Sequence, residues 1–356
     1  MFLKLGAQKM KIIQIIIVNI LIFVMGHIQA QEFHLQKTSS WTVKNFQFHN
    51  GQVLPELKLA YITLGNPNNP AVLVLHGTAG SAKGMLNPGF GGELFGPGQV
   101  LDASKYFIIL TDAIGAGNSS KPSDGLKAKF PNYNYDDMVK AQHALVTQGL
   151  GIKHLKLVMG NSMGGMQTWL WTIKYPEMMD LAMPLASSPA AMSGRNWLMR
   201  KFIVDSIKQD PQWDEGNYVK QPYSAKFATT YFSLATSGGT LGLQRLAPTS
   251  SKGNELIANR LKDQSIQDAN DLLYQWQSSE DFNPEPGLEK IKAKLLIINS
   301  ADDERNLPEL GKVESALPKL KSATYYLIPA SEQTSGHGTT GQAKWWKEQL
   351  LKFLEK

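Results

Sequence analysis

The stretch GNSMG at residues 160–164 decides the fold of this chain. Residues 155–159 are a short apolar run that predicts a buried strand, and residues 165–175 predict a helix that ends before Pro176. A Gly-flanked serine between a strand and a helix is the context that identifies G-x-S-x-G as a nucleophile elbow. The N-terminal end of the helix favours negative charge beside the hydroxyl. We therefore expect Ser162 to be a nucleophile, and the alternative is a Gly-rich structural turn.

Short apolar runs recur along the chain and alternate with helical patterns. These runs predict strands at 41–43, 57–63, 72–75, 107–110, 155–159, 181–186, 295–298 and 324–328. Helical spacing at 135–150 and about 341–354 predicts two helices, and the second should dock through Trp345, Leu350, Leu351 and Leu354. Strands that alternate with helices predict an α/β fold, with a mostly parallel central sheet and helices on both faces.

The alternation stops at residues 190–289. Helical spacing continues there, in Ile203 and Ile207, in Leu256 and Leu261, and across residues 266–276. We interpret this segment as an inserted helical lid, because inserted segments over a parallel sheet commonly build the binding site. The α/β core would then comprise 31–189 and 290–356. The alternative is a helical subdomain that only packs.

A serine alcohol needs a base that takes its proton. His337 is the predicted base, because it stands in a loop of small residues between the last predicted strand and the last helix. His34, His49 and His154 lie in polar contexts with no evident partner, and His143 is on a predicted helix, as a surface or packing residue.

The third member of such a triad is an acid that orients the imidazole. It should follow the strand at 295–298, where Asp302, Asp303 and Glu304 are adjacent. We favour Asp303, because it is the third residue after the turn residue that ends the strand and because it precedes Pro308. Asp302 is the alternative. A loop aspartate that is not the triad acid is usually a turn or cap residue.

The tetrahedral oxyanion needs two backbone N–H donors. One should come from Met163, after the serine, and the other from the loop after the strand at 72–75. Thr78 is the favoured second donor, and Ala79 is the alternative. His76 belongs to this turn and lacks a second ligand at metal-binding spacing, so we expect no metal, and no motif indicates an organic cofactor.

The formal net charge of +6 is too weak to indicate a nucleic-acid partner. Lys4, Lys9 and Lys11 lie in a segment that we expect to be removed, and residues 1–30 hold no other charged residue, so the mature value is 6 − 3 = +3. The chain has no cysteine, which excludes disulfides, thiolate metal sites and a cysteine nucleophile.

Residues 1–30 have the layout of a secretory signal. A Lys-bearing start precedes the apolar run at 12–25, and cleavage after Ala30 predicts an exported protein, periplasmic or secreted. Met10 is an alternative start. The run has about 14 residues where a membrane span needs about 20, so we expect no stable span in the mature chain. An uncleaved anchor and a buried core helix are the alternatives.

The chain resembles the α/β-hydrolase superfamily. In that superfamily the triad follows the chain order nucleophile, acid, histidine, which is the order of Ser162, Asp303 and His337 here. Residues 112–119 (DAIGAGNS) are similar to the D-x-x-G-x-G-x-S loop of that fold. Within the superfamily, the chain resembles the homoserine O-acetyltransferase-like branch. The segments that carry this resemblance are Phe130-Pro131 with Tyr133 and Tyr135, residues 137–142, residues 160–167, and residues 210–213 with Gly216 and Tyr218.

The resemblance implies acyl chemistry on a small-molecule ester or acyl substrate. Transferases of the branch carry an arginine in an R-x-A-I stretch, and here Val204 stands in its place, with Arg195 and Arg200 nearby. An exported protein would also not meet acetyl-CoA. We therefore expect a serine hydrolase that cleaves a carboxylic ester through an acyl-enzyme. The alternatives are an O-acyltransferase that uses acyl-CoA, and a binding module without catalysis.

The predicted lid is rich in aromatic residues, namely Trp197, Trp213, Tyr218 and Trp276. They favour an apolar acyl or alcohol group in the substrate. They fit equally well a role in the core of the lid itself.

Overall fold

The computed structural model describes residues 33–262 and 267–355. The predicted leader at 1–30 and its cleavage site after Ala30 lie outside the described residues. Among the residues that are described, no helix is both long and apolar enough to cross a membrane.

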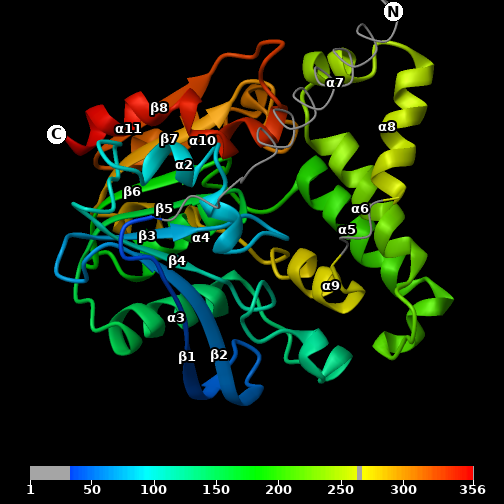
Figure 1. The fold of residues 1–356 in the computed structure, drawn as a ribbon, viewed down its shortest axis with the longest axis horizontal. Coiled ribbons are helices and arrows are strands. Elements are labelled where there is room, and N and C mark those ends of the chain that lie inside the picture. The colour runs from blue at the N-terminus through cyan, green and yellow to red at the C-terminus, as the bar shows by residue number, and fades with distance from the viewer. Residues whose placement is uncertain (1–32, 263–266, 356) are drawn as a thin grey trace, which may run out of the picture. The chain divides into compact units, whose positions relative to one another are not determined.

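The described chain begins with three strands, after which strands and helices alternate except for one run of consecutive helices (Figure 1). They are β1 (Lys37–Gln47), β2 (Val53–Leu64), β3 (Ala71–Leu75), α2 (Gly91–Leu94), β4 (Phe107–Thr111), α3 (Tyr135–Ala144), β5 (Leu155–Asn161), α4 (Met163–Lys174), β6 (Met179–Leu185), α5 (Gly194–Lys208), α6 (Tyr223–Thr236), α7 (Thr240–Leu246), α8 (Ser250–Lys262), α9 (Ala269–Gln277), β7 (Lys294–Ser300), α10 (Lys312–Ala316), β8 (Ala323–Ile328) and α11 (Lys347–Leu354). The helix predicted at 135–150 ends earlier, and a wider π-helical turn follows it at Leu145–Gly149.

Eight strands form one sheet in the order β1-β2-β4-β3-β5-β6-β7-β8. The strands β4, β3, β5, β6, β7 and β8 run parallel to one another, and β1 and β2 pair antiparallel at one edge. The carboxyl ends of the parallel strands therefore meet at one edge of the sheet. This arrangement places the loops after β3, β5, β7 and β8 close together.

Successive residues of the central strands enter two separate apolar clusters. Leu73 and Leu75 of β3 pack in the cluster that includes Met138 of α3 and Trp169 of α4. Val72 and Val74 pack in the other cluster, with Leu94 of α2 and Leu350 of α11. The sheet is thus covered on both faces, and the predicted α/β class is confirmed.

The last helix differs from its prediction. It begins at Lys347 rather than near residue 341, and short 3₁₀ turns precede it. Leu350 and Phe353 are its buried residues, and Trp346 just before it is also buried. Leu351 is exposed, so the predicted docking role of Leu351 is wrong. Because the helix starts later, Leu350 and Phe353, four and seven positions after Trp346, face the sheet, and Leu351 faces the solvent.

Between β6 and β7 the chain forms α5 to α9. Figure 1 shows α5 to α8 grouped together, with α9 nearer to the strands. Ile203 and Ile207 are buried, as are Phe232 of α6 and Trp276 of α9, whose rings lie 4.4 Å apart. The helix predicted around Leu256 and Leu261 forms as α8, but it buries none of its residues. Part of the pattern predicted at 266–276 lies outside the described residues.

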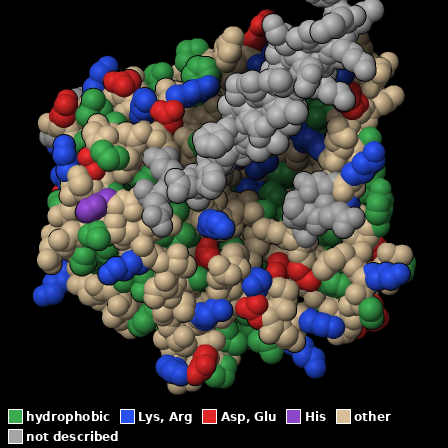
Figure 2. Space-filling view, in the orientation of Figure 1, with side chains coloured by type: hydrophobic (Ala, Val, Ile, Leu, Met, Phe, Trp, Pro, Cys, Tyr) green, Lys and Arg blue, Asp and Glu red, His purple; other side chains and the backbone are tan. Residues whose placement is uncertain are grey.

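Positive and negative side chains are interspersed on the face seen in Figure 2, and neither sign gathers among the described residues there. This distribution agrees with the small formal net charge. The exclusion of nucleic acid remains a prediction from sequence.

Candidate active site

Ser162 occupies the turn between β5 and α4 with φ +58° and ψ −112°, in a region that residues with a Cβ rarely adopt. Such a conformation costs about 1–3 kcal/mol and is typical of functional turns. The neighbouring glycines let backbone segments pass closely. A Cβ on Gly160 would stand 2.3 Å from the carbonyl oxygen of Gly164, and one on Gly164 would stand 2.2 Å from that of Leu75. Only glycine fits at these two positions.

His337 contacts the serine. Its Nε2 lies 2.7 Å from Ser162 Oγ, across 175 residues of sequence. The histidine is buried, in a 3₁₀ turn at Gly336–Gly341 that follows β8, rather than in an open loop. The structure therefore brings the predicted nucleophile and the predicted base within hydrogen-bond distance.

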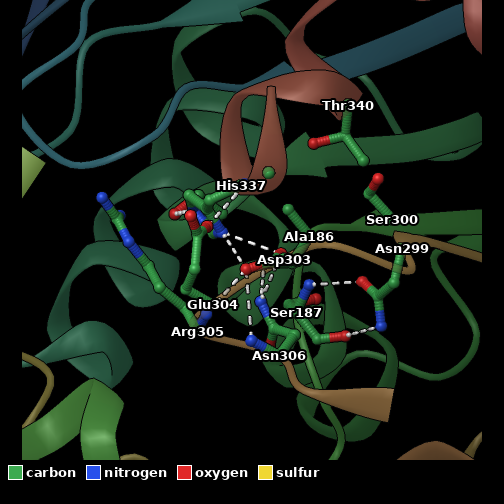
Figure 3. A network of polar contacts seen from close by, with 12 residues as sticks. Ala186, Ser187, Asn299, Ser300, Asp303, Glu304, Arg305, Asn306, His337 and Thr340 are labelled. Carbon is green, nitrogen blue, oxygen red and sulfur yellow. Dashed lines mark hydrogen bonds and ion pairs between the residues drawn. The ribbon is translucent and has the colours of Figure 1, made fainter. Parts of the chain in front are cut away.

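Asp303 lies on the other side of the imidazole. Its two carboxylate oxygens are 3.0 and 2.9 Å from His337 Nδ1. Figure 3 shows the carboxylate between His337 and Asn306, whose side-chain amide donates to it at 3.0 Å. The backbone N–H of Arg305 donates a further bond at 2.8 Å. The carboxylate is thus held in place by groups besides the imidazole.

Asp302 has different contacts. Its carboxylate accepts hydrogen bonds from Thr334 Oγ1 at 2.7 Å and from the backbone N–H of Gly336 at 3.1 Å. These partners belong to the loop that carries His337, but neither is the imidazole. Of the two aspartates that the sequence left open, Asp303 faces the ring and Asp302 braces its loop.

The charges in this group favour a neutral imidazole beside an ionised acid. Burial, and then the positive charge of Arg305, lower the pKa of His337. Burial alone would raise the pKa of Asp303, but the charge of His337 and the hydrogen bonds that Asp303 accepts outweigh it, so its pKa is lowered. With Nδ1–H donated to Asp303, Nε2 is left to accept the proton of Ser162.

The loop after β3 lies beside the serine. Its Ala79 has φ +62°, and the backbone N–H of Ala79 donates to Gln275 Oε1 of α9 at 2.9 Å. Among the described residues, the N–H of Thr78 has no partner. Met163 offers the first N–H of α4, which has no acceptor within the helix. Thr78 and Met163 are thus free to bind an oxyanion, and Ala79 is already engaged.

His76 holds this loop against the next one. Its Nδ1 donates to the carbonyl oxygen of Gly77 at 2.8 Å, and its Nε2 accepts from the N–H of Ala113 at 3.0 Å. Burial lowers the pKa of His76, which favours this neutral, doubly bonded form. His76 therefore acts as a structural link in the turn, as its sequence context predicts.

Two histidines expected to have no partner do have one. His49 Nδ1 lies 2.6 Å from a carboxylate oxygen of Asp137, and His154 Nε2 lies 2.8 Å from one of Asp180. Their carboxylates are distant in sequence, which is why the local context concealed them. His143 stacks on a tyrosine at 3.7 Å, as a packing residue. Among the described histidines, His337 is the one that contacts Ser162.

A cavity of about 340 Å³ adjoins the loop after β3. It is lined by Thr78 and by residues of the inserted segment, including Phe232, Leu272 and Trp276. Arg305 also lines it. The cavity therefore lies between the candidate oxyanion loop and the inserted helices.

Three of the four aromatic residues singled out in the inserted segment have different contacts. Trp276 lines the cavity, whereas the indole N–H of Trp213 donates to Asn270 at 2.8 Å and the hydroxyl of Tyr218 accepts from the N–H of Asn270 at 3.2 Å. Trp213 and Tyr218 thus brace α9 from within the inserted segment. Whether any of these aromatic side chains contacts a substrate remains a prediction.

Arg305 was not singled out by the sequence. Its guanidinium donates to the carbonyl and hydroxyl of Thr236 at 3.1 Å and to Ser237 Oγ at 2.7 Å, and it stacks over Phe232 at 4.4 Å. Burial and the nearby charge of Arg200 lower the pKa of Arg305 to about 9. Neither arginine forms an ion pair among the described residues. Their proximity depends on tertiary folding, so no local motif could reveal it.

Within the described residues, no group of three or more histidines and carboxylates is arranged to hold a metal ion.

The chain matches the family model for the alpha/beta hydrolase fold over residues 70–333. It is 30% identical over 329 residues to a homoserine O-acetyltransferase of Methanococcoides burtonii, an alignment that covers 80% of this chain and 67% of that protein. Across three such curated relatives, the chain spans 42% to 67% of their own length.

Two solved structures share the fold. The acetyl esterase MekB has a TM-score of 0.77 at 24% identity, with 90% of this chain and 97% of that chain covered. The homoserine O-acetyltransferase of Bacillus anthracis has a TM-score of 0.76 at 21% identity, with 92% and 99% covered.

Proposed function

Because the chain belongs to the α/β-hydrolase fold family, in its homoserine O-acetyltransferase-like branch, we propose that it is a serine hydrolase that cleaves a carboxylic ester. The observation that carries this proposal is the series of contacts from Ser162 Oγ to His337 Nε2 and from His337 Nδ1 to Asp303. A neutral imidazole in that series is a base in the correct form for activating an alcohol.

In the proposed reaction, Ser162 Oγ attacks the ester carbonyl carbon as its proton passes to His337 Nε2. The carbonyl π electrons move to the oxygen, which the backbone N–H groups of Met163 and Thr78 bind. His337 then gives the proton to the leaving alcohol, which departs and leaves an acyl-enzyme. Asp303 keeps the imidazole oriented and supports the imidazolium that forms between these steps.

Water completes the cycle. His337 accepts a proton from a water molecule, whose oxygen attacks the acyl carbon of the intermediate. The same two N–H groups bind the second oxyanion. His337 returns the proton to Ser162 Oγ, and the carboxylic acid product leaves.

The alternative function is transfer of an acyl group from acyl-CoA to an alcohol, which the names of the curated relatives favour. Two observations favour hydrolysis. Val204, at the position of the branch's arginine, is buried within the inserted helices. Arg200, one turn earlier, is also buried, and its Nε and Nη1 donate to Asn196, Tyr135 and Ser279, which leaves Nη2 as its one nitrogen without a partner among the described residues.

Residues 190–289 form the proposed lid. The support for this assignment is that Phe232, Leu272 and Trp276 line the cavity beside Thr78. The lid would exclude water and contact the acyl or alcohol group of the substrate.

We also propose that the protein is exported after cleavage near Ala30. The support comes from the sequence of residues 1–30 alone. N-terminal sequencing of the protein from its native cell fractions tests it. A chain that starts at residue 31 outside the cytoplasm would support export, and an intact chain that starts at Met1 or Met10 in the cytosol would contradict it.

Labelling with a fluorophosphonate probe tests the function, with the Ser162→Ala variant beside the wild type. We expect the wild type to be labelled at Ser162 and to hydrolyse 4-nitrophenyl acetate in water alone, and the variant to do neither. Product analysis with acetyl-CoA and homoserine distinguishes transfer from hydrolysis. If the folded wild-type protein resists the probe and hydrolyses no ester, the hydrolase proposal is wrong and a binding module without catalysis is the remaining function.

A further inference from the structure

The hydroxyl of Thr78 is buried and has no hydrogen-bond partner in the part of the chain that the structure describes. Unsatisfied buried hydroxyls are rare and unfavourable in folded proteins, and each calls for an explanation. The polar groups on either side are satisfied, because the imidazole of His76 makes two bonds and the N–H and carbonyl of Ala79 bond Gln275 and Gln267. Among the described residues, the hydroxyl and the backbone N–H of Thr78 are therefore both without a hydrogen-bond partner.

Thr78 lies at the candidate site. Thr78 lines the cavity of about 340 Å³, and the preceding residue, Gly77, lies directly beside the nucleophile. A Cβ built on Gly77 would stand 3.5 Å from the Cβ of Ser162. Three covalent bonds separate the hydroxyl oxygen of a threonine from its own backbone nitrogen, so one substrate oxygen can accept from both groups.

We propose that the hydroxyl of Thr78 is a third donor to the oxyanion, which makes Thr78 a catalytic residue through its side chain as well as its backbone. This inference rests on the proposed hydrolase function. The hydroxyl proton stays on Thr78 throughout, since it is donated as a hydrogen bond and no covalent bond to Thr78 forms or breaks. The bond strengthens as negative charge develops on the carbonyl oxygen, and it relaxes when the tetrahedral intermediate collapses.

A hydroxyl without a partner in the resting protein suits this role. An interaction made only in the transition state accelerates the chemical step, whereas one made equally with the substrate does not. The cost of leaving the hydroxyl unpaired is borne by the folded protein, and the benefit comes only during turnover. Activity and stability should therefore respond in opposite directions to its removal.

The test compares Thr78→Val, which removes the hydroxyl and keeps the shape, with Thr78→Ser, which keeps the hydroxyl. We expect Thr78→Val to lower kcat on 4-nitrophenyl acetate by about 10²–10³-fold with little change in KM, as for loss of one oxyanion donor. Its affinity for a boronic acid that forms a tetrahedral adduct should fall in proportion. Thermal stability should equal or exceed that of the wild type, because an unpaired hydroxyl is replaced by a methyl group. Thr78→Ser should stay within about tenfold of wild-type kcat.

Two outcomes would overturn the proposal. One is a Thr78→Val enzyme with wild-type kcat and boronate affinity. The other is a variant with reduced stability and a raised KM at unchanged kcat, which would indicate a structural role. Failure of the proposed function has a different signature. The wild type would then not react with a fluorophosphonate, and Ser162→Ala would hydrolyse the ester no more slowly than the wild type.

Discussion

Gln275 and Ala79 are joined by a hydrogen bond of 2.9 Å between the side-chain oxygen of the first and the backbone N–H of the second. The same amide group donates from its nitrogen to the carbonyl oxygen of Gly115 at 2.5 Å. One buried side chain of α9 thus connects the inserted segment to two loops at the edge of the sheet. It also holds Ala79 at a positive φ, which a residue with a Cβ adopts only when its surroundings enforce it.

The first prediction concerns this connection. Gln275→Leu removes both bonds, so Ala79 should relax and shift the neighbouring N–H of Thr78 away from the oxyanion. We expect kcat to fall by about 10–100-fold, because small misplacements at a reacting centre are costly. Steady-state kinetics with 4-nitrophenyl acetate measure it.

The matched control is Gln277→Leu on the same helix, where the side chain bonds Lys208 rather than the active-site loops. This control should keep wild-type kcat. Equal losses in both variants would mean that the damage comes from α9 as a whole and not from the contact with Ala79.

The second prediction separates two adjacent acids. Asp303→Asn should lower kcat by about 10⁴-fold, because an amide cannot stabilise the imidazolium and favours the wrong tautomer. Asp302→Asn should chiefly lower stability, by about 1–3 kcal/mol, because the bonds from Thr334 and Gly336 to its carboxylate weaken.

Kinetics and urea unfolding of the two variants, side by side, check this assignment. If Asp302→Asn were the inactive variant and Asp303→Asn the active one, the orientation of the imidazole proposed above would be incorrect.

The third prediction is the pH dependence of kcat/KM. The base must be neutral to act, and burial and Arg305 hold the pKa of His337 below its usual 6.5. Protonation, and with it the loss of activity, should therefore occur only as the pH falls through that lowered pKa, so activity should persist at pH 6.5 and fall in more acidic buffer. A pH–rate profile of the free enzyme measures the midpoint, and a midpoint above 6.5 would contradict the assigned environment.

The fourth prediction concerns the chemistry of the substrate. Arg305 lines the cavity and forms no ion pair among the described residues. An ester that carries a carboxylate should gain a charge-assisted bond there, so its kcat/KM should exceed that of a neutral ester of the same size by about tenfold.

Arg305→Met should remove this preference and leave kcat/KM for the neutral ester unchanged. The paired substrates control for damage to the lid contacts that Arg305 makes with Thr236 and Ser237, because such damage would slow both esters alike. An equal rate for both esters in the wild type would mean that the guanidinium serves the lid only.

The sequence was sufficient to predict those features that depend on residues close together in the chain. The strained turn at Ser162 requires glycines at 160 and 164, because their neighbours' backbones come too close for any Cβ. The strands are recognisable since residues buried on both faces must be apolar. His337 was identified from its place after the last strand, which parallel topology puts beside the elbow.

The sequence was insufficient where the partner is remote. Asp302 and Asp303 have the same chemistry and adjacent positions, so only the path of the loop after β7 decides which one faces the imidazole. The carboxylate partners of His49 and His154 come from elements that the fold, not the local pattern, brings to them. Leu351 was misplaced because the start of α11, and with it the buried face, depends on the turns that precede it.

The sequence by itself determined the α/β class and the order of the candidate nucleophile, acid and base, because apolar periodicity and Gly-dependent turns act over a few residues. The tertiary structure decided which acid faces the imidazole, which loop amide is left without a partner among the described residues, and which residues of the inserted segment line the cavity beside Thr78. Those choices depend on hydrogen bonds and burial between segments up to 196 residues apart, as between Ala79 and Gln275, and such contacts leave no periodic trace in the sequence.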